Sequence, residues 1–266
     1  YMNIEILRKP SNTGCGQSRQ YGIDHCRCEY FMFLDTDDCL YFPGSVKQMI
    51  SVMERDGLDS LYTDFMEERG NGQYRLQKQG GGWMHGKMFR TKYIQENHIR
   101  FNETRLHEDH AFNIVQLYSG GKNGTADIVT YLWKCYEKSL TRCPAIRDDY
   151  RYSMENYMVN ANYTVAQLCM RNVEADIIRD IIRKYIVSFY RHLNIMTVQG
   201  NSQENLEEVL AGIIHFWENI PSEIRNGLSE SYLTQRFYQS GGMRELIDRN
   251  IVPALTFHQF YTFLET

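Results

Sequence analysis

An apolar run passes directly into three acidic side chains in the stretch Phe31-Met32-Phe33-Leu34-Asp35-Thr36-Asp37-Asp38. This pattern predicts a buried strand that carries carboxylates to the carboxyl edge of a sheet, where open α/β sheets bind their ligands. Carboxylate oxygens suit hard divalent cations such as Mg2+ and Mn2+. Because Mg2+ usually takes one or two protein carboxylates and leaves its other positions to substrate phosphates, the stretch indicates a metal site for a phosphate-bearing substrate.

The acidic stretch also has a purely structural interpretation. Asp35 can cap the segment that follows it in a polar turn, with the other two carboxylates solvated. On these residues alone both interpretations stay open, and the flanking sequence has to decide between them.

The segments around this stretch alternate between strand and helix patterns. Residues 3–7 have strand character, and a helix is predicted over residues 16–27. Pro43 stands where a second helix would begin, and residues 58–66 predict the next strand. This order predicts an α/β fold with a mostly parallel sheet and flanking helices.

A loop-rich segment follows these elements. Residues 69–72 predict a reversal into residues 73–79, and three consecutive glycines at 80–82 form a hinge-like loop. The large and polar side chains of residues 83–90 come next and would line or cover a pocket. The alternative for residues 83–90 is the start of a helix packed by its own aromatic side chains.

A second acidic pair, Glu108 and Asp109, stands in the first turn of a predicted helix. Carboxylates in that position are stabilised by the helix dipole whatever their function, so a structural role stays open for both. The flanking His107 and His110 are three residues apart, which is not the four-residue spacing of the metalloprotease helix. Residues 126–136 alternate between apolar and polar and predict a further strand.

The pattern changes beyond residue 143. Apolar residues at helical spacing trace one stripe over residues 177–193 and another over residues 206–217, and a third helical stretch runs toward the carboxyl end. Such stripes usually belong to a helical core. We therefore divide the chain into an α/β domain over residues 1–143 and a helical region over residues 144–266.

The composition bounds the class of protein. The chain has 266 residues, 42% of them hydrophobic, a net charge of −4 and a pI near 6.1, which is typical of a globular protein without a broad basic surface for nucleic acid. No apolar run is long enough to cross a bilayer, and no secretory signal pattern opens the chain. The seven cysteines lack the paired spacing of a zinc site and indicate reduced thiols. A cytoplasmic protein is therefore expected.

In their order along the chain, these motifs resemble those of family 2 glycosyltransferases, which are inverting enzymes with the nucleotide-sugar-binding GT-A fold. Several ordered motifs over roughly residues 3–142 are far more specific than any one of them. The matching residues are Asn12-Thr13-Gly14 with Ser18-Arg19, then Phe33 to Asp38, Pro43, Trp83 with His85-Gly86-Lys87 and Phe89-Arg90, Glu108-Asp109, and Trp133 with Ser139-Leu140-Thr141-Arg142.

The resemblance implies that a sugar moves from a nucleoside diphosphate sugar, in the first place a UDP-sugar, to an acceptor hydroxyl with inversion. It assigns the metal, Mn2+ or Mg2+, to Asp37, where the cation would neutralise charge on the departing diphosphate. It assigns the role of catalytic base to Asp109, which would take the proton of the acceptor hydroxyl. The remaining implied contacts are Asn12, Arg19, Asp35 and Arg142 for the donor, and Trp83, His85 and Glu108 for sugar or acceptor.

The acceptor is not implied by the resemblance. A glycan, a lipid, a protein or a modified DNA base could each supply the hydroxyl, and the mild acidity of the chain makes DNA the less suitable of these. The helical region is expected to position the acceptor or to join a larger assembly, without carrying chemistry itself.

Two departures from the family pattern keep other interpretations open. Gln20 replaces the usual Asn after Arg19, and the family's first two strand–helix units have no counterpart before Asn12, so we expect the nucleotide-binding half to be incomplete at its amino terminus. That expectation supports a non-catalytic remnant, retained for binding or for a structural role. A phosphatase of the haloacid dehalogenase type is a weaker alternative, because Cys39 stands where that family has Thr or Val.

Overall fold

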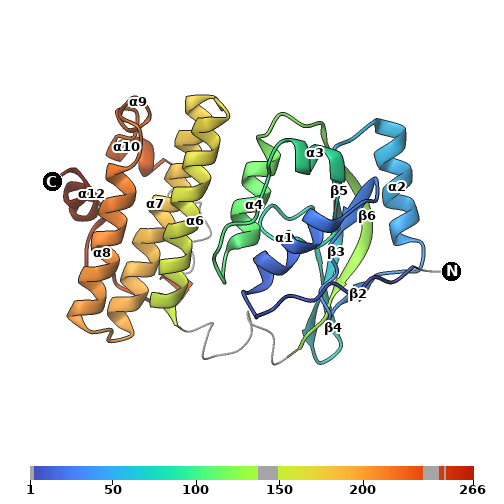
Figure 1. Ribbon diagram of the computed structural model, residues 1–266. Helices are drawn as coiled ribbons and strands as arrows, with labels where there is room; N and C mark the ends of the chain where they lie inside the picture. Colours follow the sequence, from blue (N-terminus) through green and yellow to red (C-terminus); the bar gives the residue numbers. More distant parts are fainter. Residues whose placement is uncertain (1–2, 137–148, 236–245, 249) are drawn as a thin grey trace. The chain divides into compact units, whose positions relative to one another are not determined.

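The computed structural model describes residues 3–136, 149–235, 246–248 and 250–266. The chain divides into two compact units, Tyr1–Ser139 and Leu140–Thr266. The first unit is a sheet with flanking helices, and the second is helical (Figure 1). The predicted domain boundary at residue 143 lies outside the described residues and stays a prediction.

Six strands of the first unit form one sheet. Five of them follow the order β1 (Tyr30–Met32), β5 (Lys87–Arg90), β3 (Ser60–Gly70), β6 (Asn123–Trp133), β2 (Cys39–Leu40), and β4 (Gln73–Gln77) pairs with β3 beside this path. The predicted α/β class is confirmed. The expectation of a mostly parallel sheet is wrong for the described strands, since β3 and β6 are parallel and the four other pairs are antiparallel. Strand–helix alternation gives parallel pairs when consecutive strands become neighbours, whereas β1 and β2 pair with later strands that run the opposite way.

Helices cover both faces of this sheet (Figure 1). The helices are α1 (Cys15–His25), α2 (Ser45–Asp56), α3 (Thr91–Glu96) and α4 (Glu108–Leu117). Successive residues of a strand point to opposite faces, and β5 illustrates the result. Met88 joins the core that Met49 and Met53 of α2 form on one face. Phe89 packs on the other face against Phe112 of α4, with ring centroids 5.7 Å apart.

Most of the predicted elements of the first unit are present. The predicted helix over residues 16–27 is α1, the helix expected after Pro43 is α2, and the strand ending in carboxylates is β1. One prediction and one alternative are wrong. Residues 3–7 do not form a strand, because no described strand pairs with them, and Ile4 and Ile6 are 76% and 74% exposed. The helix start considered within residues 83–90 is instead the strand β5.

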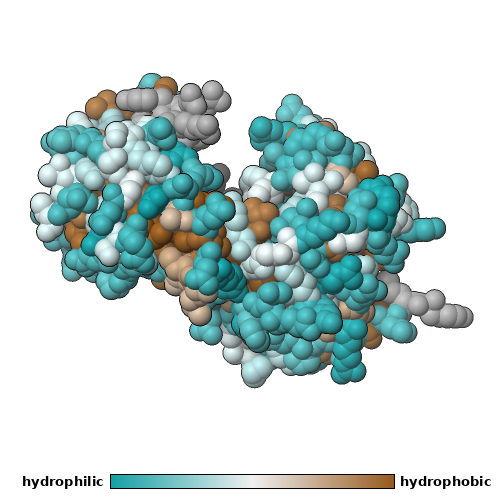
Figure 2. Space-filling model, turned by 90° about the horizontal axis from the view of Figure 1, so that it is seen from above, coloured by the Kyte–Doolittle hydropathy of each residue, from teal (hydrophilic) through white to brown (hydrophobic). Residues whose placement is uncertain are grey.

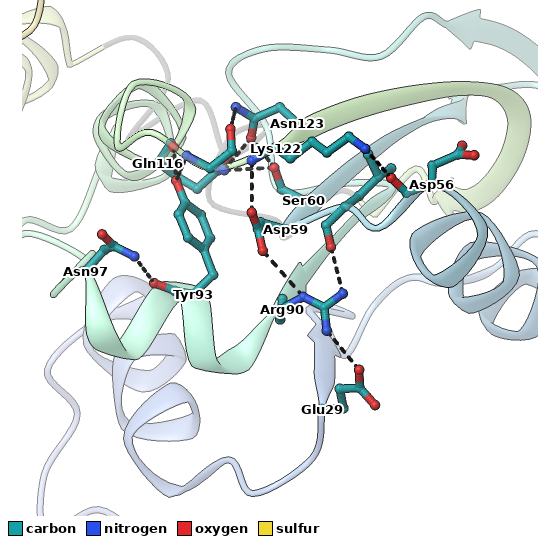
Figure 3. A network of polar contacts seen from close by, with 12 residues as sticks. Glu29, Asp56, Asp59, Ser60, Arg90, Tyr93, Asn97, Gln116, Lys122 and Asn123 are labelled. Atoms are coloured by element: carbon teal, nitrogen blue, oxygen red, sulfur yellow. Dashed lines mark hydrogen bonds and ion pairs between the residues drawn. The ribbon is translucent and has the colours of Figure 1, made fainter.

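A buried polar network holds the carboxyl-terminal end of α4 on the sheet (Figure 3). Gln116 is fully buried, and its Nε2 donates to Ser60 Oγ at 2.8 Å and to Asn123 Oδ1 at 2.7 Å. Its Oε1 accepts from the hydroxyl of Tyr62, and its carbonyl accepts from Tyr93 Oη at 2.8 Å. Because these partners come from β3, β6 and α3, the network sets the position of α4 and hence of the acidic pair at its other end.

The second unit consists of helices in its described part. They are α6 (Tyr150–Met170), α7 (Ala175–Val198), α8 (Gln203–Glu218), α9 (Ser222–Arg225), α10 (Glu230–Leu233) and α12 (Phe257–Glu265). The two predicted stripes lie in α7 and α8, where Ile182, Phe189 and Ile213 are fully buried. Of the helices in the described ranges, none has the length and apolar character to span a membrane. On the face that Figure 2 shows, hydrophilic residues predominate and hydrophobic patches lie among them. The mean hydropathy of the chain is −0.51.

Candidate active site

Arg19 joins three elements that are far apart in the sequence. From α1, its Nη2 donates to Asp35 Oδ1 at 2.9 Å and to Oδ2 at 3.1 Å, just beyond β1. Its Nη1 donates to Glu108 Oε1 at 3.2 Å, at the start of α4. The Arg19 and Glu108 side chains are 11% and 7% exposed, so this contact lies inside the unit. Among the described residues, the buried Arg19 Nε has no hydrogen-bond acceptor.

The close approach of α1 to α4 depends on Gly16. A Cβ at Gly16 would lie 2.6 Å from Glu108 Cγ, which is closer than real Cβ contacts come. The absence of a side chain therefore lets Arg19 reach Glu108 from the next turn of α1.

Burial and mutual repulsion disfavour ionisation of the acidic pair. Burial raises the pKa of Glu108 to about 7, and the neighbouring Asp109 adds to the rise, while Arg19 opposes it. Burial also raises the pKa of Asp109, again against the effect of Arg19. Burial alone would lower the pKa of Arg19, but the carboxylates around it outweigh burial and raise it. A carboxyl pair of this kind can accept a proton near neutral pH.

The turn before α4 gives the acidic pair its orientation. His107 has a φ of 63°, a left-handed conformation that is uncommon for residues other than glycine. The chain enters α4 directly after it, with Glu108 and Asp109 in the first turn, as the sequence predicts. Asp109 is half-buried, and its Oδ1 accepts from the His110 amide at 2.8 Å.

Asp35, Asp38 and His85 could hold a metal ion, because each offers a ligand atom within 4.8 Å of the others. His85 Nε2 lies 3.8 Å from Asp38 Oδ2, which accepts from Tyr131 Oη at 2.6 Å. The His85 ring also stacks on Tyr131, with centroids 4.7 Å apart. Each carboxylate oxygen has two lone pairs, so Asp35 and Asp38 can coordinate a metal ion in addition to accepting their present hydrogen bonds. Two carboxylates and an imidazole fit Mn2+, and with less preference Mg2+.

Asp37, the predicted metal ligand, lies in the same loop but has an exposed side chain and is outside this group of three. Its assignment stays a prediction. Sequence reasoning missed Asp38 as a ligand and placed His85 with the substrate. The third acid of the run was the available signal for Asp38, whereas nothing in the sequence shows that a residue 47 positions later packs beside it.

Aromatic rings form a wall next to these carboxylates. His85 is nearly buried, and its ring centroid lies 5.1 Å from that of Phe65 and 5.1 Å from that of Trp133. Trp83 packs edge-on against Phe65 at 5.8 Å and lies 6.3 Å from Trp133, yet it remains 41% exposed. A half-exposed indole can stack on the apolar face of a sugar ring while its N–H meets a hydroxyl.

Asn12, another predicted donor contact, does not join this cluster. Asn12 Oδ1 accepts from the Gly14 amide at 3.0 Å in the turn before α1. Asn12 also lines an open cavity of about 470 Å3 with Lys9, Ser18 and Tyr21, which does not include Arg19 or Asp35. Arg142 lies outside the described residues.

Known proteins with related sequences are glycosyltransferases. Residues 1–115 match the model of Glycosyl transferase family 2. An uncharacterised glycosyltransferase of Rickettsia conorii is 31% identical over 64 residues. That alignment spans 23% of this chain and 10% of the relative.

Solved structures extend the likeness over nearly the whole chain. Residues 1–349 of TarS from S. aureus, solved with UDP-GlcNAc, give a TM-score of 0.64 at 16% identity over 98% of this chain and 74% of that one. A longer TarS structure gives 0.59 at 14% identity, over 95% of this chain and 43% of that chain. At this identity the likeness concerns the fold. Over residues 1–115, this chain is therefore similar to glycosyl transferase family 2.

Proposed function

We propose that this chain transfers a sugar from a UDP-sugar to an acceptor hydroxyl, with inversion at the anomeric carbon and with a divalent cation. One observation carries the proposal. Arg19 draws Asp35 and Glu108 into one cluster, which joins the metal-fitting group at one end and the acidic pair of α4 at the other. A polar turn with solvated acids, the structural alternative, would not need a buried arginine between them.

The donor side of the cluster suits a diphosphate. Asp35, Asp38 and His85 would hold Mn2+ or Mg2+, with Asp37 exposed beside them, and the cation supplies positive charge for the phosphate oxygens. Arg19 fixes Asp35 through two hydrogen bonds and keeps its Nε for an anion. A TarS structure was solved with UDP-GlcNAc, which supports a UDP-sugar as the donor.

The acceptor side suits deprotonation of a hydroxyl. Asp109 accepts the proton as the new bond forms, and its raised pKa makes it a stronger base than an ordinary aspartate. Glu108 is occupied by Arg19 and holds the first turn of α4 in place. Trp83, half-exposed beside Trp133, supports a sugar-bearing acceptor.

Calorimetry and product analysis test the proposal. We expect the chain to bind UDP in the presence of Mn2+ and to release UDP slowly from a matching UDP-sugar, and EDTA should abolish both. Asp38→Asn should weaken Mn2+-dependent UDP binding by at least tenfold. Asp37→Asn, measured in parallel, tests whether Asp37 is the metal ligand, as the sequence predicts. UDP binding without any release from a panel of UDP-sugars would favour the non-catalytic alternative, and the lack of Mn2+-dependent binding would refute the site.

A further inference from the structure

The backbone of the glycine-rich loop Gly80–Trp83 is held by hydrogen bonds from buried side chains. Lys87 Nζ donates to the Gly81 carbonyl at 3.1 Å. Asn113 Nδ2 donates to the carbonyls of Gly82 and Trp83, each at 3.2 Å. Three consecutive carbonyls are therefore held by two side chains, one from β5 and one from α4. Glycines usually give a loop freedom, which these bonds remove.

The chain entering the loop is also fixed. Asp64 of β3 is 2% exposed, and it accepts from the Gln79 amide at 3.3 Å and from Gln79 Nε2 at 2.8 Å. Lys78 Nζ donates to the same carboxylate at 2.8 Å. The loop is thus anchored at both ends by side chains of the sheet and of α4.

The two side chains that hold the loop carbonyls are more deeply buried than lysine and asparagine side chains usually are. Lys87 is 1% exposed and Asn113 is 3% exposed. A buried lysine is costly, since desolvation lowers the pKa of Lys87 to about 7 even though Asp109 opposes the change. Methionine would fill similar space without that cost, so a core role alone does not explain the ammonium group. Both the charged and the neutral form of the Lys87 amine can donate the hydrogen bond to the Gly81 carbonyl.

The loop lies against the catalytic end of α4. A Cβ at Gly82 would lie 3.6 Å from His110 Cδ2, one residue beyond Asp109. Asn113 stands one helical turn after Asp109 on the same helix and holds the carbonyl of Trp83 itself. The position of Trp83 is therefore tied to the helix that carries the proposed base.

We propose that Lys87 and Asn113 are positioning residues that hold Trp83 as a fixed wall for a sugar ring of the acceptor. They do not touch the reacting atoms. Their bonds set the distance between the indole and the first turn of α4, so that a pyranose stacked on Trp83 presents its hydroxyl to Asp109. This inference rests on the proposed function, and the loop itself can be tested without turnover.

The experiment follows Trp83 directly. In a Trp133→Phe, Trp217→Phe background Trp83 is the sole tryptophan, because the chain has three. Lys87→Met and Asn113→Asp remove the donors and keep the approximate size. We expect each to raise the acrylamide quenching constant of Trp83 at least twofold and to speed amide exchange over residues 80–83 at least tenfold. Mn2+-dependent UDP binding should stay within twofold of the parent.

Methyl glycosides of glucose, galactose, mannose and N-acetylglucosamine are the acceptor probes. At least one of these glycosides should change the fluorescence of Trp83 when it binds to the single-tryptophan parent. The affinity for that glycoside should fall about tenfold when Lys87→Met or Asn113→Asp is added. Gln116→Met at the far end of α4 and Lys92→Met on the surface are the controls. Gln116→Met should lower the melting temperature without changing Trp83 quenching.

Each result decides a separate question. Unchanged quenching and exchange in Lys87→Met and Asn113→Asp would overturn the positioning role, whatever the enzyme does. A loosened loop without any response of the parent to the four glycosides would overturn the acceptor wall. Loss of UDP binding in the parent would instead refute the proposed function, and it would leave the loop measurements valid.

Discussion

Single side chains carry most of the proposed chemistry, and Asp109 is the residue proposed as the base. It lies in the first turn of α4, half-buried, with a pKa raised by burial. If it is the base, Asp109→Asn should lower transfer by at least about a hundredfold, since a positioned base contributes roughly 10²–10⁴-fold. Mn2+-dependent UDP binding should persist. Near-normal transfer at matched folded concentration would move the base elsewhere, and Glu108→Gln would be the next variant.

Glu108 gives the folded chain a pH-dependent stability. Its pKa rises from an ordinary 4.5 to about 7 on folding, mainly through burial. Between these values the folded state binds more protons than the unfolded state, so the free energy of unfolding falls as the pH rises. Glu108→Gln cannot ionise there. In urea titrations, the free energy of unfolding of the variant should therefore rise relative to that of the parent from pH 5 to pH 8. A constant difference in the free energy of unfolding over this range would contradict the raised pKa of Glu108.

The residues that sequence reasoning missed act through contacts that appear only on folding. Arg19, Asp35 and Glu108 were found because motifs mark them. Asp38 lay in the same acidic run but was not assigned as a ligand, and Asn113 has no such mark. Lys87 lay inside a quoted motif, but its sequence position does not reveal that its ammonium group is buried under a glycine loop.

At the scale of elements, segments with a clear apolar pattern were predictable and segments without one were not. α2, α4 and α7 follow from apolar spacing, and β1 follows from its apolar run. β5 has four residues and begins with a buried lysine, so no local pattern distinguishes it from a loop or a helix start. Strand direction was also beyond the sequence, because pairing partners come from distant segments.

The contact between α1 and α4 can be tested with two glycines of the same helix. Gly16→Ala would place a Cβ 2.6 Å from Glu108 Cγ, and Glu108 cannot move without straining its bond to Arg19. We expect a loss of about 1–3 kcal/mol in the free energy of unfolding, as for other overpacked sites. Gly22→Ala meets nothing within 4 Å and should stabilise by about 0.4–1 kcal/mol.

Chemical denaturation of both variants gives the comparison directly. A stabilised Gly16→Ala variant would mean that α1 and α4 separate at little cost, and the close packing around Glu108 would then be unimportant. Mn2+-dependent UDP binding of each variant shows whether the same contact also supports the donor side.

In the whole molecule, the proposed site belongs to one of the two units. Every described residue assigned here to metal, base, donor or acceptor lies in Tyr1–Ser139, and the described helices of the second unit display core stripes. The likeness to TarS covers 98% of this chain, so the helical unit belongs to the shared fold. An α/β unit and a helical region could be predicted from the change in periodicity, but the task of the helical region could not, because core stripes look alike in any bundle.

Removal of residues 140–266 separates the two tasks. If the helical unit positions the acceptor, the remaining unit should still bind UDP with Mn2+ and release UDP from a UDP-sugar to water within a few-fold of the full chain. Transfer to an added acceptor should fall much further, because water needs no positioning while a bulky acceptor does. Circular dichroism and a cooperative melting transition first establish that the truncated unit is folded. A folded truncation that no longer releases UDP would show that the helical unit contributes to the chemistry of the donor.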